Sequence, residues 1–108
     1  MMRIDELVAS IAALRREDLE LWIGERIVIA REDEGEPVFE EAECARVQLI
    51  CTLHYDMDVE TGTLPIVLDL IDQLHETRRR LNALGSAVLV QDEEVRRVIL
   101  KRVKEREG

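Results

Sequence analysis

Apolar side chains recur at three- and four-residue spacing along most of the chain, the pattern of helices with one buried face. The first predicted helix covers residues 4–14 and ends at a polar break formed by two arginines. The second begins at Glu17 and Asp18, acids that the positive end of a helix dipole favours, and buries Trp22. Leu21 falls on the opposite side of this helix, so we expect it to be exposed.

The pattern changes between residues 27 and 39. IVIA is apolar and β-branched, EDEGEP carries turn residues, and VF is apolar again. Two apolar runs around a turn sequence predict a β-hairpin, and this one has an acidic tip. A third, largely buried helix is predicted to begin at Glu40 and Glu41. Its expected buried face carries Ala42, Ala45, Leu49, Thr52 and Leu53, widened by Val47, Ile50 and Cys51.

Residues 55–62 are predicted to form a turn, and residues 63–85 the longest helix, with a proline in its first turn and Gly85 as its C-terminal cap. Arg78 interrupts the apolar seam of this helix. A charge in a seam lowers the stability of a continuous coiled coil but can set its register or partner. We expect the first half of the helix to pack on the preceding core. The second half is expected to meet either a second copy of the chain or the last helix. The residues assigned to this packing or dimer seam are Ile71, Leu74, Arg78, Leu81 and Leu84.

The last predicted helix has Asp92 as its N-cap and an apolar stripe that includes Val95, Ile99 and Val103. The sequence contains no internal repeat, low-complexity tract or interdomain linker. We therefore expect one structural domain in three parts. These parts are a core with an acidic hairpin (1–62), a long packing or dimerisation helix (63–85) and a C-terminal amphipathic helix (86–108).

The net charge of −9 is unevenly distributed. Residues 1–60 hold sixteen acids against six Arg and no Lys, whereas residues 61–108 hold eight acids against nine bases. Binding of duplex DNA relies on Lys and Arg that displace counterions from phosphates, and an acidic face is repelled instead. DNA is therefore not an expected partner of the first half.

Apolar runs in the chain are far shorter than the roughly 20 residues that a membrane span requires, and no basic segment precedes an apolar one near the start. Cys44 and Cys51 are seven residues apart on a predicted helix, so their Cα atoms should lie about 10 Å apart, beyond disulfide reach. Two reduced thiols fit a cytoplasmic protein without membrane contact.

Residues with chemical potential are few. Cys44, Cys51 and His54 could face one another as metal ligands. Metal sites usually need three or four ligands that neighbouring groups hold in place, and no further Cys or clustered His supplies them. His54 and His75 each have an aspartate nearby, as a catalytic base would, yet neither has a nucleophile or a cofactor motif beside it. We therefore expect no metal, no cofactor and no enzymatic activity.

The predicted order of helix, helix, hairpin, helix and longer helix is that of a winged helix of the MerR type. The expected fold is mainly α: a MerR-type winged helix-turn-helix with a small β-hairpin wing, followed by a longer helix and a C-terminal helix. The segments ELWIGERIVIA, PVFEEAECARVQLICTLHYDMDV and LPIVLDLIDQL resemble the chaperone-modulator (CbpM) family. The resemblance covers roughly residues 4–84 and includes no catalytic motif.

What the resemblance implies is a regulator of a DnaJ-like co-chaperone of the CbpA type, which binds the J domain and blocks its productive contact with a DnaK-type chaperone. J domains present a basic helix to an acidic chaperone surface, so an acidic module can compete for that helix. We expect the contact surface on the second helix and the hairpin, chosen by charge and expected exposure rather than by the resemblance. Its residues are Asp18, Glu25, Glu32, Asp33, Glu34 and Glu36, with Leu21 as an apolar anchor.

Three alternatives remain open from the residues alone. In the first, the acidic run between residues 32 and 43 binds no partner. Its acids then only make the hairpin tip soluble and favour the start of the next helix. The chain can be a MerR-type transcription regulator that binds DNA as a dimer. It can also be a small adaptor that forms a homodimer through its last two helices.

Overall fold

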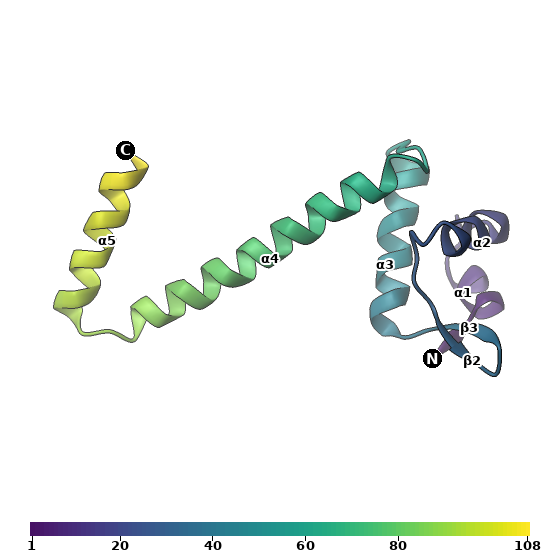
Figure 1. Cartoon of the computed structure of the whole chain (residues 1–108), viewed down its shortest axis with the longest axis horizontal. Helices are drawn as coiled ribbons and strands as arrows, with labels where there is room; N and C mark the ends of the chain where they lie inside the picture. The colour runs from purple at the N-terminus through teal and green to yellow at the C-terminus, as the bar shows by residue number, and fades with distance from the viewer. The chain divides into compact units, whose positions relative to one another are not determined.

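The computed structural model describes all 108 residues, which divide into two compact units. Unit 1 comprises Met1–Leu68 and unit 2 comprises Asp69–Gly108. The chain is mainly helical, as expected (Figure 1). It contains one small antiparallel sheet of three strands, of which only the hairpin was predicted. The boundary between the units lies inside the longest helix, so each unit is described by itself.

Unit 1 contains short helices and the sheet, and unit 2 contains helices alone. In chain order the elements are β1 (Met2–Arg3), α1 (Ile4–Ser10), α2 (Arg16–Gly24), β2 (Arg31–Asp33), β3 (Glu36–Phe39), α3 (Glu41–Cys51), the π-helical segment η1 (Thr52–Asp56), α4 (Leu64–Leu89) and α5 (Glu93–Glu107).

The sheet has the strand order β1-β3-β2, so the hairpin strand β3 is central and β2 lies at an edge. Asp33 pairs with Glu36, which leaves a two-residue loop of Glu34 and Gly35. Both loop residues have positive φ, 53° and 81°. Two positive φ angles define the hairpin turn whose twist matches the flanking strands, and glycine reaches that conformation without strain. The predicted turn is confirmed at this position.

The predicted strand at IVIA is wrong, because residues 27–30 lie outside the sheet. The amides of Ile27 and Val28 instead donate to the carbonyl of Trp22, at 2.8 Å and 3.1 Å, and fold the chain back after α2. Val28 is buried while Ile29 is 77% exposed. The amides of the apolar run therefore bond to the C-terminal end of α2. The buried side chain of Val28 holds this segment against the core, although the segment has no strand partner.

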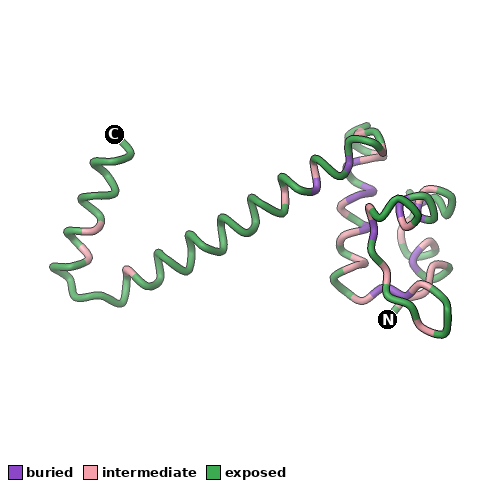
Figure 2. The backbone as a smooth tube through the Cα atoms, viewed as in Figure 1, coloured by how far each residue is buried: buried purple, intermediate pink, exposed green.

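One hydrophobic core lies in unit 1, and it contains every buried residue of the chain (Figure 2). Trp22, Phe39 and Leu19 are completely enclosed. Leu64, at the start of α4, is completely buried as well. Leu21 is exposed, as its place opposite Trp22 predicts. Burial of large apolar side chains, each contributing about 1.5–3 kcal/mol, stabilises unit 1.

The predicted buried face of α3 is wrong in its centre. Of its predicted members, Leu53 is buried, Leu49 is partly covered, and Ala42, Ala45 and Thr52 are exposed. Val47, Ile50 and Cys51 are buried. The residues expected only to widen the face form it, because larger side chains remove more apolar surface from water than alanine does. Cys44 and Cys51 are both free thiols, as their separation predicts.

The predicted turn at residues 55–62 begins later than expected, because α3 continues into η1 and carries Tyr55 with it. The rings of Trp22, His54 and Tyr55 contact one another, with centroids 5.1–6.1 Å apart. His54 Nδ1 lies 2.7 Å from the carbonyl oxygen of Val59 and donates to it, which closes the turn after η1. The segment thus joins α3 to the α2 side of the core.

Helix ends differ from the prediction at two places. α1 ends at Ser10, whose hydroxyl donates to the carbonyl of Leu7 at 2.9 Å, although Leu14 beyond it is still buried. Gly85 is not a cap, because α4 continues through it to Leu89. An internal glycine costs a helix only about 1 kcal/mol, so its neighbours can carry the helix past it. Asp92 occupies the N-cap of α5, as predicted.

Candidate functional site

The acidic hairpin is the first candidate surface. Arg3 of β1 crosses beneath it, with its guanidinium 2.6 Å from a Glu36 carboxylate oxygen and 3.4 Å from an Asp33 carboxylate oxygen. Glu32 and Glu34 are exposed and have no ion pair. The negative charge of the hairpin that remains open to a partner is therefore concentrated on these two residues.

Asp18, predicted to belong to the same surface, is only partly exposed and has a structural role. Its carboxylate accepts a hydrogen bond from the Tyr55 hydroxyl, and the same hydroxyl oxygen accepts the Arg15 amide at 3.2 Å. Burial and this bond to Asp18 raise the pKa of Tyr55 to about 12. Asp18 thus ties the start of α2 to η1.

The predicted contact residues come from two parts of unit 1. Glu32, Asp33, Glu34 and Glu36 belong to the hairpin, Asp18 and Leu21 to α2, and Glu25 caps the C-terminal end of α2. The start of α2 approaches the hairpin, because Arg16, Asp5 and Glu36 line one small hollow.

Basic residues near α2 are partly engaged within the chain. The Arg16 guanidinium forms ion pairs with Asp5 and, at 3.0 Å, with Glu20. The hydrogen bond that the Arg16 side chain donates to Asp5 is the main cause that raises the pKa of Arg16, and the bond it donates to Glu20 comes next. A helix that reads DNA needs its bases directed at phosphates, and here one of the few available is already paired with carboxylates.

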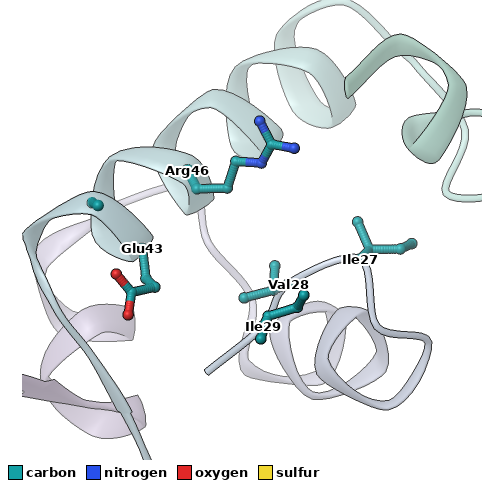
Figure 3. Close-up of a pocket in the computed structure, with 6 residues that line it drawn as sticks. Ile27, Val28, Ile29, Glu43 and Arg46 are labelled. Atoms are coloured by element: carbon teal, nitrogen blue, oxygen red, sulfur yellow. The ribbon is translucent and has the colours of Figure 1, made fainter. Parts of the chain in front are cut away.

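A groove of about 320 Å³ lies between the segment after α2 and the first half of α3. Ile27, Val28 and Ile29 line one side, and Ala42, Glu43 and Arg46 line the other (Figure 3). Sequence reasoning missed this groove because it assigned residues 27–30 to a strand. Ile27 is partly covered, Val28 is buried and Ile29 is exposed, and no pattern within IVIA alone predicts that all three line a groove.

The second large surface belongs to unit 2, which has no buried residue. Leu74, Leu81 and Leu84 of the predicted seam are exposed, Ile71 is only partly covered, and Arg78 is exposed among them. α5 adds further apolar side chains: Val95, Val98, Leu100 and Val103. Exposed apolar patches on this scale mark contacts with other molecules.

Part of that surface is concave. Leu81, Leu84, Val88 and Leu89 of α4 and Ile99, Leu100 and Val103 of α5 line a hollow of about 330 Å³ together with Gly85. The expected approach of Ile99 and Val103 to the distal part of α4 is therefore present. Most of these side chains nevertheless stay exposed, so the approach does not complete a core.

The two thiols are the remaining groups with chemical potential. No group of three or more Cys, His, Asp or Glu side chains is placed to hold a metal ion. Burial raises the pKa of Cys51 to about 11 and also raises that of Cys44, and nearby carboxylates act in the same direction. Thiols with raised pKa values carry little thiolate at neutral pH, which makes them poor nucleophiles.

Comparison of the sequence with protein-family models and with curated proteins, and of the structure with solved structures, finds no match. None of the helices combines the length and the apolar content needed to cross a bilayer. The observations that bear on function are thus the acidic patches of unit 1, the groove beside α3 and the apolar face of unit 2.

Proposed function

We propose that the chain regulates a DnaJ-like (CbpA-type) co-chaperone by binding its J domain and preventing contact with a DnaK-type chaperone. The resemblance of residues 4–84 to the chaperone-modulator family motivates this proposal, and with it the assignment of unit 1 as a MerR-type winged helix. The mechanism is steric and electrostatic occlusion in the cytoplasm, and it includes no chemical step.

The observation that carries the proposal is the charge of unit 1. Met1–Leu68 contains sixteen Asp and Glu against six Arg, a net charge of −10. A basic J-domain helix is attracted by such a field, and complementary potential accelerates association and rejects acidic partners. The acids available for direct contact are Glu32 and Glu34 at the hairpin and Glu25 at the C-terminal cap of α2. Leu21, one helical turn before Glu25, is the exposed apolar anchor.

The proposal includes a homodimer formed by the apolar face of unit 2. The exposed seam residues on α4 are the contact, and Leu81 and Leu84 belong to the hollow shared with α5. Each leucine removed from water contributes about 1.5–3 kcal/mol, so a few such contacts on each copy suffice for stable pairing. A dimer presents two acidic units to two J domains.

The test is a calorimetric titration of a purified J domain into the full chain at low and moderate salt. Charge reversal of Glu32 and Glu34 to Lys should weaken binding by about tenfold or more at low salt and by less at moderate salt. The matched control reverses Asp56 and Glu60, two exposed acids after α3, and changes the net charge equally. Equal effects of the two pairs would remove the hairpin from the contact, and no binding by the unaltered chain would remove the proposal.

A gel shift with nonspecific duplex DNA at low salt tests the transcription-regulator alternative. A DNA-binding protein retains weak phosphate-driven affinity under these conditions. The acidic charge of unit 1 predicts no shift. A shift that disappears with rising salt would favour the MerR-type regulator instead.

A further inference from the structure

The groove beside α3 adjoins a stretch of backbone that has no hydrogen-bond partner. The amides of Ile27 and Val28 are satisfied by Trp22, but no backbone bond reaches Ile29 or Ala30. The chain then enters β2, whose outer side has no neighbouring strand because the order is β1-β3-β2. An extended segment with free amides and carbonyls thus runs from Ile29 into the sheet.

The register shows which backbone groups of β2 face outward. Asp33 and Glu36 flank the two-residue loop and exchange hydrogen bonds, so Glu32, one residue before, points its amide and carbonyl away from β3. Pro37, the partner of Glu32 in the register, has no N–H to donate, which agrees with this assignment. Ala30, two residues earlier in the extended chain, faces the same way by the same alternation.

Side chains beside this free edge supply an apolar hollow and negative charge. Ile29 exposes most of its surface and lines the groove with Ile27 and Ala42 (Figure 3). Glu43 on the opposite side is paired with Arg31 at 3.5 Å, so the unpaired acids beside the edge are Glu32 and Glu34. Charged side chains protect a sheet edge from indiscriminate pairing and favour a partner of opposite charge.

A second copy of the chain is a poor occupant of this edge. Residues 31–36 contain one Arg and four acids, a local net charge of −3. Joining two copies edge to edge brings two such segments together, which like-charge repulsion opposes. The occupant that satisfies both the edge and its charge is basic.

We propose that an extended segment of another protein, alternating basic and apolar residues, adds as a strand to the outer edge of β2 and places one apolar side chain in the groove against Ile29. Backbone hydrogen bonds at Ala30 and Glu32 supply affinity, and the groove and the acids supply specificity, as in other peptides that extend a sheet. This site requires no J domain, so it stands or falls separately from the function proposed above.

The direct test is an NMR titration of the ¹⁵N-labelled full chain with a blocked heptapeptide of alternating lysine and valine. The largest amide shifts are expected at residues 29–32. A second peptide with every backbone amide N-methylated keeps the charge but donates no strand hydrogen bonds, and it should bind about tenfold more weakly. Equal binding of the two peptides, or shifts centred elsewhere, would overturn the proposal. An alternating glutamate and valine peptide should not bind.

Two pairs of variants separate edge, groove and charge. Glu32→Pro removes the outward amide without removing a bond to β3, and Glu32→Gln removes only the charge, so the proline variant should lose about tenfold more affinity for the lysine–valine peptide. Ile29→Asn should also weaken binding, whereas Met57→Asn, at another exposed apolar position, should not. Indistinguishable proline and glutamine variants that both retain the native CD spectrum would show that charge alone attracts the peptide.

Discussion

Unit 1 and unit 2 use apolar residues in opposite ways. All thirteen buried hydrophobic residues lie in Met1–Leu68, whereas ten of the fifteen exposed large hydrophobic residues lie in Asp69–Gly108. The charges differ as well, with −10 on unit 1 and eight acids against nine bases, a net +1, on unit 2. The first unit completes its own core and repels other copies. The second presents apolar surface that it does not bury, and lacks the charge that would keep copies apart.

The two units depend on different sources of stability. A packed core stabilises unit 1 within one chain. Isolated helices in water are marginal, and most helix stability in proteins comes from packing of an apolar face. The helices of unit 2 therefore depend on what covers that face, and unit 1 does not.

Removal of a core side chain should destabilise unit 1 more than any surface substitution does. Phe39→Ala deletes a fully buried ring and should lower the free energy of unfolding of unit 1 by about 3–5 kcal/mol. Leu84→Ala, at an exposed position of unit 2, should change it by less than about 0.5 kcal/mol in dilute solution. Urea unfolding followed by Trp22 fluorescence measures both. Comparable losses would mean that the two units share one core.

Self-association tests whether the exposed apolar face of unit 2 is covered by a second copy. Replacing Leu81 and Leu84 with Lys should raise the dimer dissociation constant by at least about a hundredfold, because apolar burial is lost on both copies and like charges meet. Analytical ultracentrifugation over a range of concentrations measures the change. Asn82→Lys with Ser86→Lys adds the same charge at exposed polar positions and should have a smaller effect. A double leucine variant that stays dimeric would place the contact elsewhere.

A dependence of stability on alkaline pH should be confined to unit 1. The pKa values of Cys51 and Tyr55 are raised from 9.0 and 10.0 to about 11 and about 12, so the folded state favours their protonated forms. Their contribution is complete below about pH 9 and is lost as the pH rises through the folded values.

The free energy of unfolding of unit 1 should therefore fall by roughly 1–2 kcal/mol between pH 8 and pH 11. Urea unfolding in the presence of a reductant measures it. Cys51→Ala removes the thiol and should flatten the profile between pH 9 and pH 10. An unchanged profile in that variant would mean that Cys51 does not titrate with unfolding.

A substitution at Gly85, with a small expected effect, tests whether α4 runs through this position. Gly85 lies inside the helix with open space where a Cβ would stand, so Gly85→Ala should increase helical CD signal and stabilise the helix by about 0.5–1 kcal/mol. Gly35→Ala is the contrasting change, because φ at Gly35 is 81° and alanine is strained there. A loss of helicity in Gly85→Ala would indicate a left-handed cap at that position.

Helix positions and the hairpin turn were predictable because local chemistry specifies them. Acids at helix starts, a proline in the first turn of α4 and the Glu34-Gly35 loop all act within a few residues. The burial of Trp22 against the exposure of Leu21 follows from helix periodicity alone.

What could not be predicted depends on distant residues. Asp18 is partly covered because Tyr55, thirty-seven positions away, bonds to it, and Arg3 neutralises hairpin acids from thirty positions away or more. Nothing in a local pattern shows that IVIA lacks a strand partner, since β-branched residues favour strands wherever a partner exists. Apolar seam residues of α4 continue past Leu68 at Ile71 and Leu74, so the sequence does not show that burial stops at Leu68.

Because α4 is continuous across the boundary between the two units, its amides should differ in protection from hydrogen exchange along its length. Its first turn is held by the buried side chains of Leu64 and Leu68, while the following residues have no buried anchor up to Leu89. Opening of such a helix proceeds from its unanchored end, so in a solitary chain amide protection should decline steadily from Leu68 towards Leu89. A molecule that covers the distal turns of α4 should extend amide protection turn by turn towards Leu89. The length of the protected segment then shows how much of α4 is covered by a molecule bound to unit 2.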